Sequence, residues 1–246
     1  GNHADMEWMK SPARIEIENL LKGVKSILVV GLNYFTEPKK ENPNRLLIGR
    51  YAWGNDYHKV IEKRLKELGR WLERERPDIV GLQELKSSND KLEKDMFADL
   101  GYSFVFNGQK SYNGCGILSR YEMTNTSYFF SGNEQDQQSR WISSEINGIL
   151  FCNLYLPNGN PLGTDKFEYK INWMKLLYNY TKKLKLLGKP VVLMGDFNVI
   201  PQEIDCKSPQ KWQNDALFDI KVRSIFFKIL NLGFYDALRL KTSQPN

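Results

Sequence analysis

The sequence contains little cysteine and little histidine. Its three cysteines, Cys115, Cys152 and Cys206, lie far apart among 246 residues, and its two histidines are His3 and His58. This spacing forms neither a zinc-ligand pattern nor a disulfide framework, which favours a reducing compartment. Apolar runs long enough to cross a membrane are absent, and so is the pattern of a signal peptide. We therefore expect a cytoplasmic monomer with no membrane partner.

Acidic residues are outnumbered by basic ones. Lysine and arginine together number 35, against 29 for aspartate and glutamate, and the net charge is +6. A basic balance fits a polyanionic partner such as a nucleic acid, although by itself it does not prove one. Hydrophobic residues make up 41% of the chain. This is enough for a sizeable core in one large domain or in two small ones.

Apolar runs and amphipathic segments alternate in an order typical of α/β proteins. Predicted strands at 26–33 and 78–83 flank a helix over 56–76, which Pro77 ends. Further along, the pattern predicts a short helix at 91–100, strands at 102–107, 114–118, 124–129, 141–146 and 149–156, and a long helix at 165–187. A strand from 191 and a helix over about 214–232 follow. We expect a two-sheet α/β sandwich.

The segment from Val191 to Pro201 combines a buried strand with polar residues at its end. Asp196 and Asn198 follow the apolar run directly, after Gly195. Residues i and i+2 of a strand point to the same side, and open α/β sheets bind ligands beyond the carboxyl ends of their strands. This pattern predicts a catalytic pair. Asp and Asn also favour turns, so a simple strand-to-loop turn is the alternative.

Three other predicted strands end in polar residues. These are Asn33, Glu84 and Tyr155. A carboxylate at the mouth of a sheet suits Mg²⁺, which prefers oxygen ligands and binds through one or two carboxylates plus substrate phosphate. Each of these residues alone is explained equally well as a cap or a turn residue. Their recurrence at strand ends favours a functional site.

Residues 77–246 resemble the exonuclease III branch of the endonuclease/exonuclease/phosphatase family, the Mg²⁺-dependent abasic-site endonucleases. The resemblance rests on separate motifs in the right order: PDIVGLQELK (77–86), FNGQKSYNGCGILS (106–119), EQDQQSRWIS (134–143), NLYLPNGNPLGTDKFEYK (153–170), VVLMGDFNVIP (191–201), DALF (215–218) and LGFYDALR (232–239). It implies hydrolysis of a phosphodiester in double-stranded DNA, 5′ to an abasic site or from a 3′ end.

The resemblance also implies roles for the strand-end residues. Glu84 corresponds to the metal-binding glutamate, with Mg²⁺ as the cofactor and Mn²⁺ as an alternative. Tyr155 corresponds to a tyrosine that contacts the scissile phosphate. Asp196 corresponds to the aspartate that activates water or transfers a proton, and Asn198 to its phosphate-orienting partner. Asn33 would stand in for an asparagine at the metal site, although a turn residue is the simpler interpretation.

Five further residues are implied to lie near the DNA. They are Gln109, Lys110, Arg140, Asn158 and Lys170. Cations at these positions would make the salt-sensitive phosphate contacts that dominate nucleic-acid affinity. For each cation, a solvated surface charge with no ligand is an equally good explanation.

Residues 1–70 resemble the N-terminal region of epoxyqueuosine reductase, a cobalamin and iron–sulfur enzyme of tRNA modification. The matching pieces are ADMEWM (4–9), VKSILVVGLNYF (24–35) and RYAWGNDYHKVIEKRLKEL (50–68). Three scattered cysteines cannot hold an iron–sulfur cluster, so reductase activity is not expected. We expect 1–70 to supply a strand and a helix to a nuclease-like domain at 71–246, in one packed unit.

The family pattern includes C-terminal motifs that this sequence does not show. They carry a second metal-site aspartate and a catalytic histidine, whereas His3 and His58 lie in no such motif. We therefore expect weak or no hydrolysis from this truncated chain and an exposed sheet edge. A non-catalytic nucleic-acid-binding module and a cobalamin-binding remnant are the alternative functions.

Overall fold

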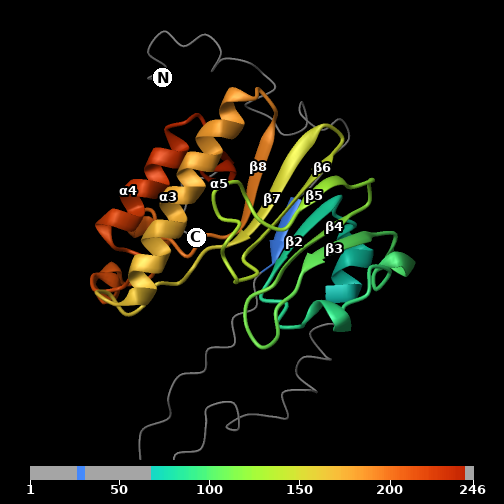
Figure 1. The fold of residues 1–246 in the computed structure, drawn as a ribbon, viewed down its shortest axis with the longest axis horizontal. Coiled ribbons are helices and arrows are strands. Elements are labelled where there is room, and N and C mark those ends of the chain that lie inside the picture. Colours follow the sequence, from blue (N-terminus) through green and yellow to red (C-terminus); the bar gives the residue numbers. More distant parts are fainter. Residues whose placement is uncertain (1–26, 31–67, 242–246) are drawn as a thin grey trace, which may run out of the picture.

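A computed structural model describes residues 27–30 and 68–241, and its strands form two four-stranded sheets that face each other (Figure 1). The first sheet has the order β1 (Ile27–Val30), β2 (Ile79–Gln83), β4 (Cys115–Ser119) and β3 (Ser103–Asn107). The second has the order β5 (Thr124–Ser127), β6 (Trp141–Ile146), β7 (Ile149–Tyr155) and β8 (Val191–Asp196). Pairs β1–β2 and β7–β8 are parallel, and the other neighbours are antiparallel. The predicted two-sheet α/β fold is confirmed.

Helices cover the outer faces of both sheets. The longest are α3 (Asp165–Leu186) and α4 (Ile220–Leu230), which lie against the second sheet, while helical residues 68–75 lie against the first (Figure 1). A short helix, α5 (Ala237–Lys241), follows. No helix within 68–241 is both long enough and apolar enough to cross a bilayer.

Two helix predictions differ from the structure. The segment predicted as one helix at 91–100 forms two short 3₁₀ turns, Asn89–Lys91 and Ala98–Leu100, because Phe97 turns inward against Phe104 and Gly101 adopts φ of 80°. The helix predicted over about 214–232 begins only at Ile220, where the Asp219 carboxylate accepts the Lys221 N–H at 2.8 Å.

Strand alternation builds three apolar layers. In β7, Phe151 and its inward neighbours lie between the sheets, whereas Cys152 and its outward neighbours contact α3. Cys115 belongs to the inter-sheet layer. The thiols of Cys115 and Cys152 are both fully buried, whereas Cys206 is partly exposed. Each fully buried large apolar side chain contributes about 1.5–3 kcal/mol. Burial on both faces explains why these strands read as nearly continuous apolar runs.

Asn153 is a polar residue of the inter-sheet layer. Its side chain is fully buried, and Nδ2 donates to the carbonyl oxygens of Leu82 and Gly116, each at 2.8 Å. Its Oδ1 accepts from Gln83 Nε2 at 2.5 Å. A Cβ at Gly81 would lie 2.9 Å from Asn153 Oδ1, so the sheets approach too closely there for a larger residue. Asn153 therefore fixes β7 against β2 and β4 close to their functional ends.

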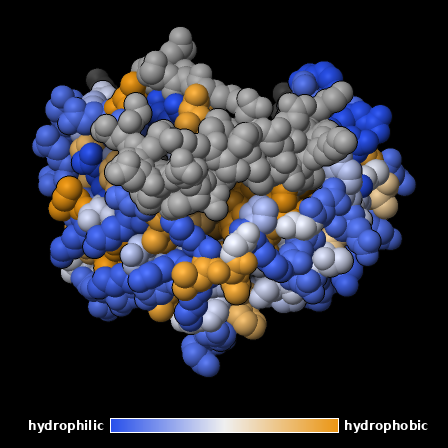
Figure 2. Space-filling view, turned by 90° about the horizontal axis from the view of Figure 1, so that it is seen from above, coloured by the Kyte–Doolittle hydropathy of each residue, from blue (hydrophilic) through white to orange (hydrophobic). Residues whose placement is uncertain are grey.

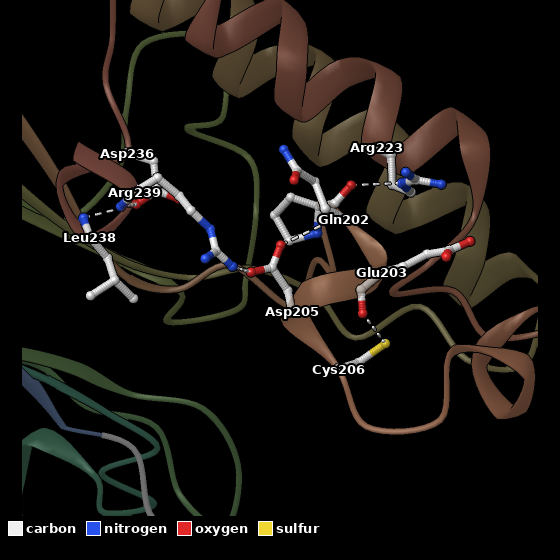
Figure 3. A network of polar contacts seen from close by, with 9 residues as sticks. Gln202, Glu203, Asp205, Cys206, Arg223, Asp236, Leu238 and Arg239 are labelled. Carbon is white, nitrogen blue, oxygen red and sulfur yellow. Dashed lines mark hydrogen bonds and ion pairs between the residues drawn. The ribbon is translucent and has the colours of Figure 1, made fainter. Parts of the chain in front are cut away.

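A polar network holds the segment between β8 and α5 (Figure 3). Arg239 forms an ion pair with Asp205, and Arg223 Nε donates to the Pro201 carbonyl at 2.9 Å. Asp236 Oδ1 accepts from two backbone N–H groups at the start of α5. The described face seen in Figure 2 is mostly hydrophilic, with apolar residues in small groups.

Candidate active site

Three of the predicted site residues meet at the carboxyl ends of β2, β7 and β8. The parallel register of β7 and β8 places Tyr155 directly beside Asp196. The Gln83–Asn153 contact brings the end of β2 to the same edge, where the charge of Glu84 raises the pKa of both Tyr155 and Asp196. The sheet topology thus assembles Glu84, Tyr155 and Asp196 from distant parts of the chain.

Asn198 reaches this edge by a turn and not by the strand pleat. β8 ends at Asp196, and Asn198 has φ of 45°, so the premise that both residues project from one extended strand is wrong. Instead, the Asn198 N–H donates to Asp196 Oδ1 at 2.9 Å, and Asn198 Nδ2 donates to the Leu156 carbonyl at 2.8 Å. Position 195 requires glycine, because its φ is 128° and a Cβ there would lie 2.0 Å from the Leu154 oxygen. Asp196 and Asn198 therefore form the turn and also belong to the candidate site.

Burial sets the protonation of the two central groups. The pKa of Asp196 is raised above its usual value, mainly by burial; the Asn198 N–H lowers it in part, and the Glu84 charge raises it further. Burial, followed by the negative charge of Glu84, raises the pKa of Tyr155 to about 12. Tyr155 therefore keeps its proton at neutral pH and can donate it in a hydrogen bond, whereas Asp196 is adjusted toward accepting a proton.

Glu84 is the best-placed carboxylate for a divalent cation. It adopts φ of 56°, and its Oε2 lies 2.7 Å from Lys86 Nζ. Within residues 27–30 and 68–241, no group of three histidine, cysteine, aspartate or glutamate side chains is arranged to hold a metal. Mg²⁺ needs only one or two carboxylates together with water and phosphate. The charge of Glu84 raises the pKa of Asp196, so the two carboxylates lie within electrostatic reach of each other.

Arg140 supports the site from the side of Tyr155. Its guanidinium carbon lies 4.9 Å from the centre of the Tyr155 ring, and Nη1 donates to the Tyr155 carbonyl at 3.1 Å. Its Nε donates to Gln138 Oε1 at 2.7 Å. The side chain is half-buried, and its positive charge partly offsets the rise in the pKa of both Tyr155 and Asp196. Arg140 therefore contacts both the ring and the carbonyl oxygen of Tyr155.

The other predicted DNA-binding residues differ in position. Lys110 is exposed, and Gln109 Oε1 accepts from the Ser139 N–H at 2.9 Å, so Gln109 joins two loops. Asn158 is exposed, and its Nδ2 lies 3.4 Å from Asn198 Oδ1. Lys170 is fully buried, unlike the exposed cation that a phosphate contact at the surface requires. Asn33 lies outside the described residues.

Two contributors were not predicted from the sequence. Lys86 is the ionic partner of Glu84, and Asn153 anchors β7 between the sheets. A signal for Asn153 was present, because an isolated asparagine at an inward position of an apolar strand must find buried hydrogen-bond partners. Lys86 stands in the PDIVGLQELK motif with no distinguishing pattern of its own.

The sequence model of the Endonuclease/Exonuclease/phosphatase family matches residues 62–243. The chain belongs to this family. It is 30% identical to an exodeoxyribonuclease of Bacillus subtilis (strain 168) over 188 residues, which cover 76% of this chain and 73% of that protein. A DNA-(apurinic or apyrimidinic site) endonuclease of Dictyostelium discoideum is 29% identical over 85% of this chain, which spans 57% of the length of that relative. Enzymes of this family generally depend on a divalent metal.

Solved structures agree with this assignment. An AP endonuclease from Archaeoglobus fulgidus superposes with a TM-score of 0.68 and 37% identity, covering 73% of this chain and 69% of that one. The 3′ phosphatase NExo from Neisseria, solved with a product DNA hairpin, gives a TM-score of 0.68 and 33% identity over 72% of this chain and 68% of that one. The predicted nuclease resemblance is confirmed.

The N-terminal resemblance is confirmed as well. Residues 14–86 match the model described as Epoxyqueuosine reductase QueG, DUF1730. An epoxyqueuosine reductase of Prochlorococcus marinus (strain NATL2A) is 56% identical over 78 residues, which are 32% of this chain and 25% of that protein. The two family matches overlap over residues 62–86. The boundary at residue 70 stays a prediction.

Proposed function

We propose that this chain is a metal-dependent hydrolase of DNA phosphodiester bonds of the exonuclease III type. Its substrate would be double-stranded DNA, cleaved at abasic sites or from 3′ ends. The observation that carries the proposal is the meeting of Glu84, Tyr155 and Asp196 at one sheet edge, with Asn198 bonded to Asp196. The names of the nuclease relatives support the same chemistry.

The proposed cofactor is Mg²⁺, with Mn²⁺ as the alternative. Glu84 would hold it, together with water and substrate oxygens, and Asn33 is proposed as a second ligand. A bound divalent cation supplies charge stabilisation at the phosphate and at the leaving oxygen. The Lys86 ammonium contacts Glu84 at 2.7 Å, and this ion pair orients the carboxylate.

The remaining residues have roles that follow from their environments. Asp196, whose pKa is raised by burial, would accept the proton of the attacking water. Tyr155, which stays protonated, would donate a hydrogen bond to a phosphoryl oxygen. Asn198 would orient the phosphate while its N–H fixes the Asp196 carboxylate. Arg140, Gln109, Lys110 and Asn158 are proposed to border the DNA.

The test is a nicking assay on an abasic duplex and on a 3′-recessed duplex, with Mg²⁺, Mn²⁺ or EDTA. We expect weak cleavage, and only with metal, and Asp196→Asn should lower the rate by at least about 10²-fold, as removal of a general base does. Asp99→Asn, at an exposed position, is the matched control. No cleavage by the wild-type chain under any condition would refute the proposal. Turnover equal to that of the Bacillus subtilis relative would contradict the expectation of an impaired enzyme.

A non-catalytic nucleic-acid-binding module is the second candidate, favoured by the net charge of +6. It predicts salt-sensitive duplex binding without metal-dependent cleavage, and the same samples measure both. The cobalamin-binding hypothesis rests on residues 1–70, most of which lie outside the described part. A spectral titration with cobalamin tests it. A cytoplasmic location and a monomeric state stay predictions.

A further inference from the structure

Lys170 is a buried charge next to the candidate site. Its side chain on α3 is fully buried, and burial lowers its pKa to about 8, which the charges of Asp215, Asp196 and Asp219 partly offset. A charge taken out of water costs several kcal/mol unless it gains well-placed partners. The position of this ammonium group therefore needs an explanation in terms of what it contacts.

The ammonium contacts the backbone of two different segments. Nζ donates to the carbonyl oxygen of Asn158 at 3.0 Å and to that of Asn198 at 2.6 Å. The first carbonyl belongs to the segment that follows β7, and the second to the turn that follows β8. Lys170 thus joins the two loops that extend from Tyr155 and Asp196.

The first loop lies directly against the aliphatic part of Lys170. Gly159 has φ of 84°, and a Cβ at this position would lie 2.5 Å from Lys170 Cδ and 3.1 Å from Lys170 Cβ. Any larger residue at position 159 would push the loop away from the lysine. Because residue 159 is glycine, the loop lies close enough to Lys170 for its ammonium group to reach both carbonyl oxygens.

The second contact holds a residue in the left-handed region. Asn198 has φ of 45°, which asparagine adopts more readily than most other non-glycine residues, and three bonds hold it there. Its N–H is bonded to Asp196, its side-chain amide to Leu156, and its carbonyl to Lys170. The Asn198 N–H and carbonyl belong to adjacent peptide planes of one tight turn, so releasing the carbonyl would loosen the turn that holds the N–H against the Asp196 carboxylate.

We propose that Lys170 is a positioning residue that orients Asp196 through Asn198, and that it makes no contact with substrate phosphate. Its effect on turnover rests on the proposed hydrolase function. Its effect on the two loops does not, because the contacts are present in the protein alone. The predicted role of Lys170 in DNA binding is thereby replaced by one inside the protein.

Enzyme kinetics on the abasic duplex separate the two roles. Lys170→Met should lower kcat by about 10²-fold, because misplacement of a catalytic group by about 1 Å has this effect. KM should change less than about threefold, and the dependence of log affinity on log salt should keep its slope. A lost phosphate contact would instead weaken binding and reduce that slope by about 1. Lys170→Arg should recover part of kcat, because its guanidinium can donate to both carbonyls.

The matched control is Lys175→Met, which removes an exposed lysine of the same helix and should leave kcat, KM and the slope unchanged. Amide hydrogen exchange supplies a readout that needs no activity. Lys170→Met should speed exchange at 157–160 and 197–199 and leave β6 unchanged. If the wild-type chain does not cleave DNA, the proposed function fails, and hydrogen exchange still decides the role of Lys170.

A second variant covers the case in which Lys170→Met does not fold. Gly159→Ala keeps the ammonium group but displaces the loop from it, and it should reproduce the loss of kcat and the faster exchange at 157–160. The proposal is overturned by a higher KM with a reduced salt slope, by unchanged exchange in both loops, or by wild-type kcat in Lys170→Met.

Discussion

Replacement of Asn153 by leucine tests how the two sheets are held together. The substitution keeps the branched shape of the side chain but removes the two hydrogen bonds to Leu82 and Gly116 and the one from Gln83. A net loss of about 0.5–1.5 kcal/mol for each of the three bonds, and about 1–3 kcal/mol for the stranded Gln83 donor, gives about 2.5–7.5 kcal/mol in total. This is a large fraction of a typical unfolding free energy of about 5–15 kcal/mol.

Urea unfolding followed by tryptophan fluorescence measures the effect. With a slope of about 2–3 kcal/mol per molar, the midpoint should fall by about 1–4 M with an unchanged slope. Asn179→Leu, at an exposed position of α3, is the control and should stay within about 0.5 kcal/mol of wild type. The double variant with Gln83→Leu should recover part of the loss, because no donor is then stranded. A loss below about 1 kcal/mol, or strict additivity, would refute the reasoning.

Three further predictions concern the site and its support. Gly195→Ala should destabilise the protein by at least about 2 kcal/mol in the same urea assay, because the new Cβ would overlap the Leu154 carbonyl. The pKa of Asp196 in the folded protein lies above its usual 3.8, so ionisation of Asp196 disfavours folding. Asp196→Asn should therefore raise Tm at about pH 7, and this gain should vanish as the pH falls toward about 4. A gain that grows at low pH would contradict the assigned direction of the pKa shift. Arg239→Ala removes the cationic partner of the Asp205 carboxylate, which keeps its bond from the Gln202 N–H, and should cost about 1–3 kcal/mol, with faster hydrogen exchange in α5 by mass spectrometry; unchanged exchange would show that the pair does not hold this helix.

The strand ends could be predicted because apolar runs mark buried strands directly. The run before Asp196 and the run before Glu84 both appear as β8 and β2, with their polar residues at the expected edge. That Glu84 and Asp196 meet depends on sheet order, which local patterns do not encode. The family motifs supplied this order at the sequence level, and the parallel β7–β8 register now gives its physical basis.

Side-chain environment was harder to predict than position. A lysine in a helix usually lies at the surface, so the burial of Lys170 could not be inferred without knowing that two loops cross over it. The turn at Asn198 stood only as the alternative, because strand periodicity was extended two residues beyond the end of β8. The segment at 91–100 has the composition of a helix, but the contact of Phe97 with Phe104 interrupts it.

The three thiols differ in burial, so their alkylation rates can report on the opening of the folded protein. Cys115 and Cys152 are fully buried in different layers, one between the sheets and one beneath α3, and burial raises the pKa of both. Cys206, in contrast, is partly exposed. A maleimide dye would therefore label Cys206 in the native protein without any engineered cysteine. The two slower alkylation rates would then time the separation of the sheets and the lifting of α3 independently.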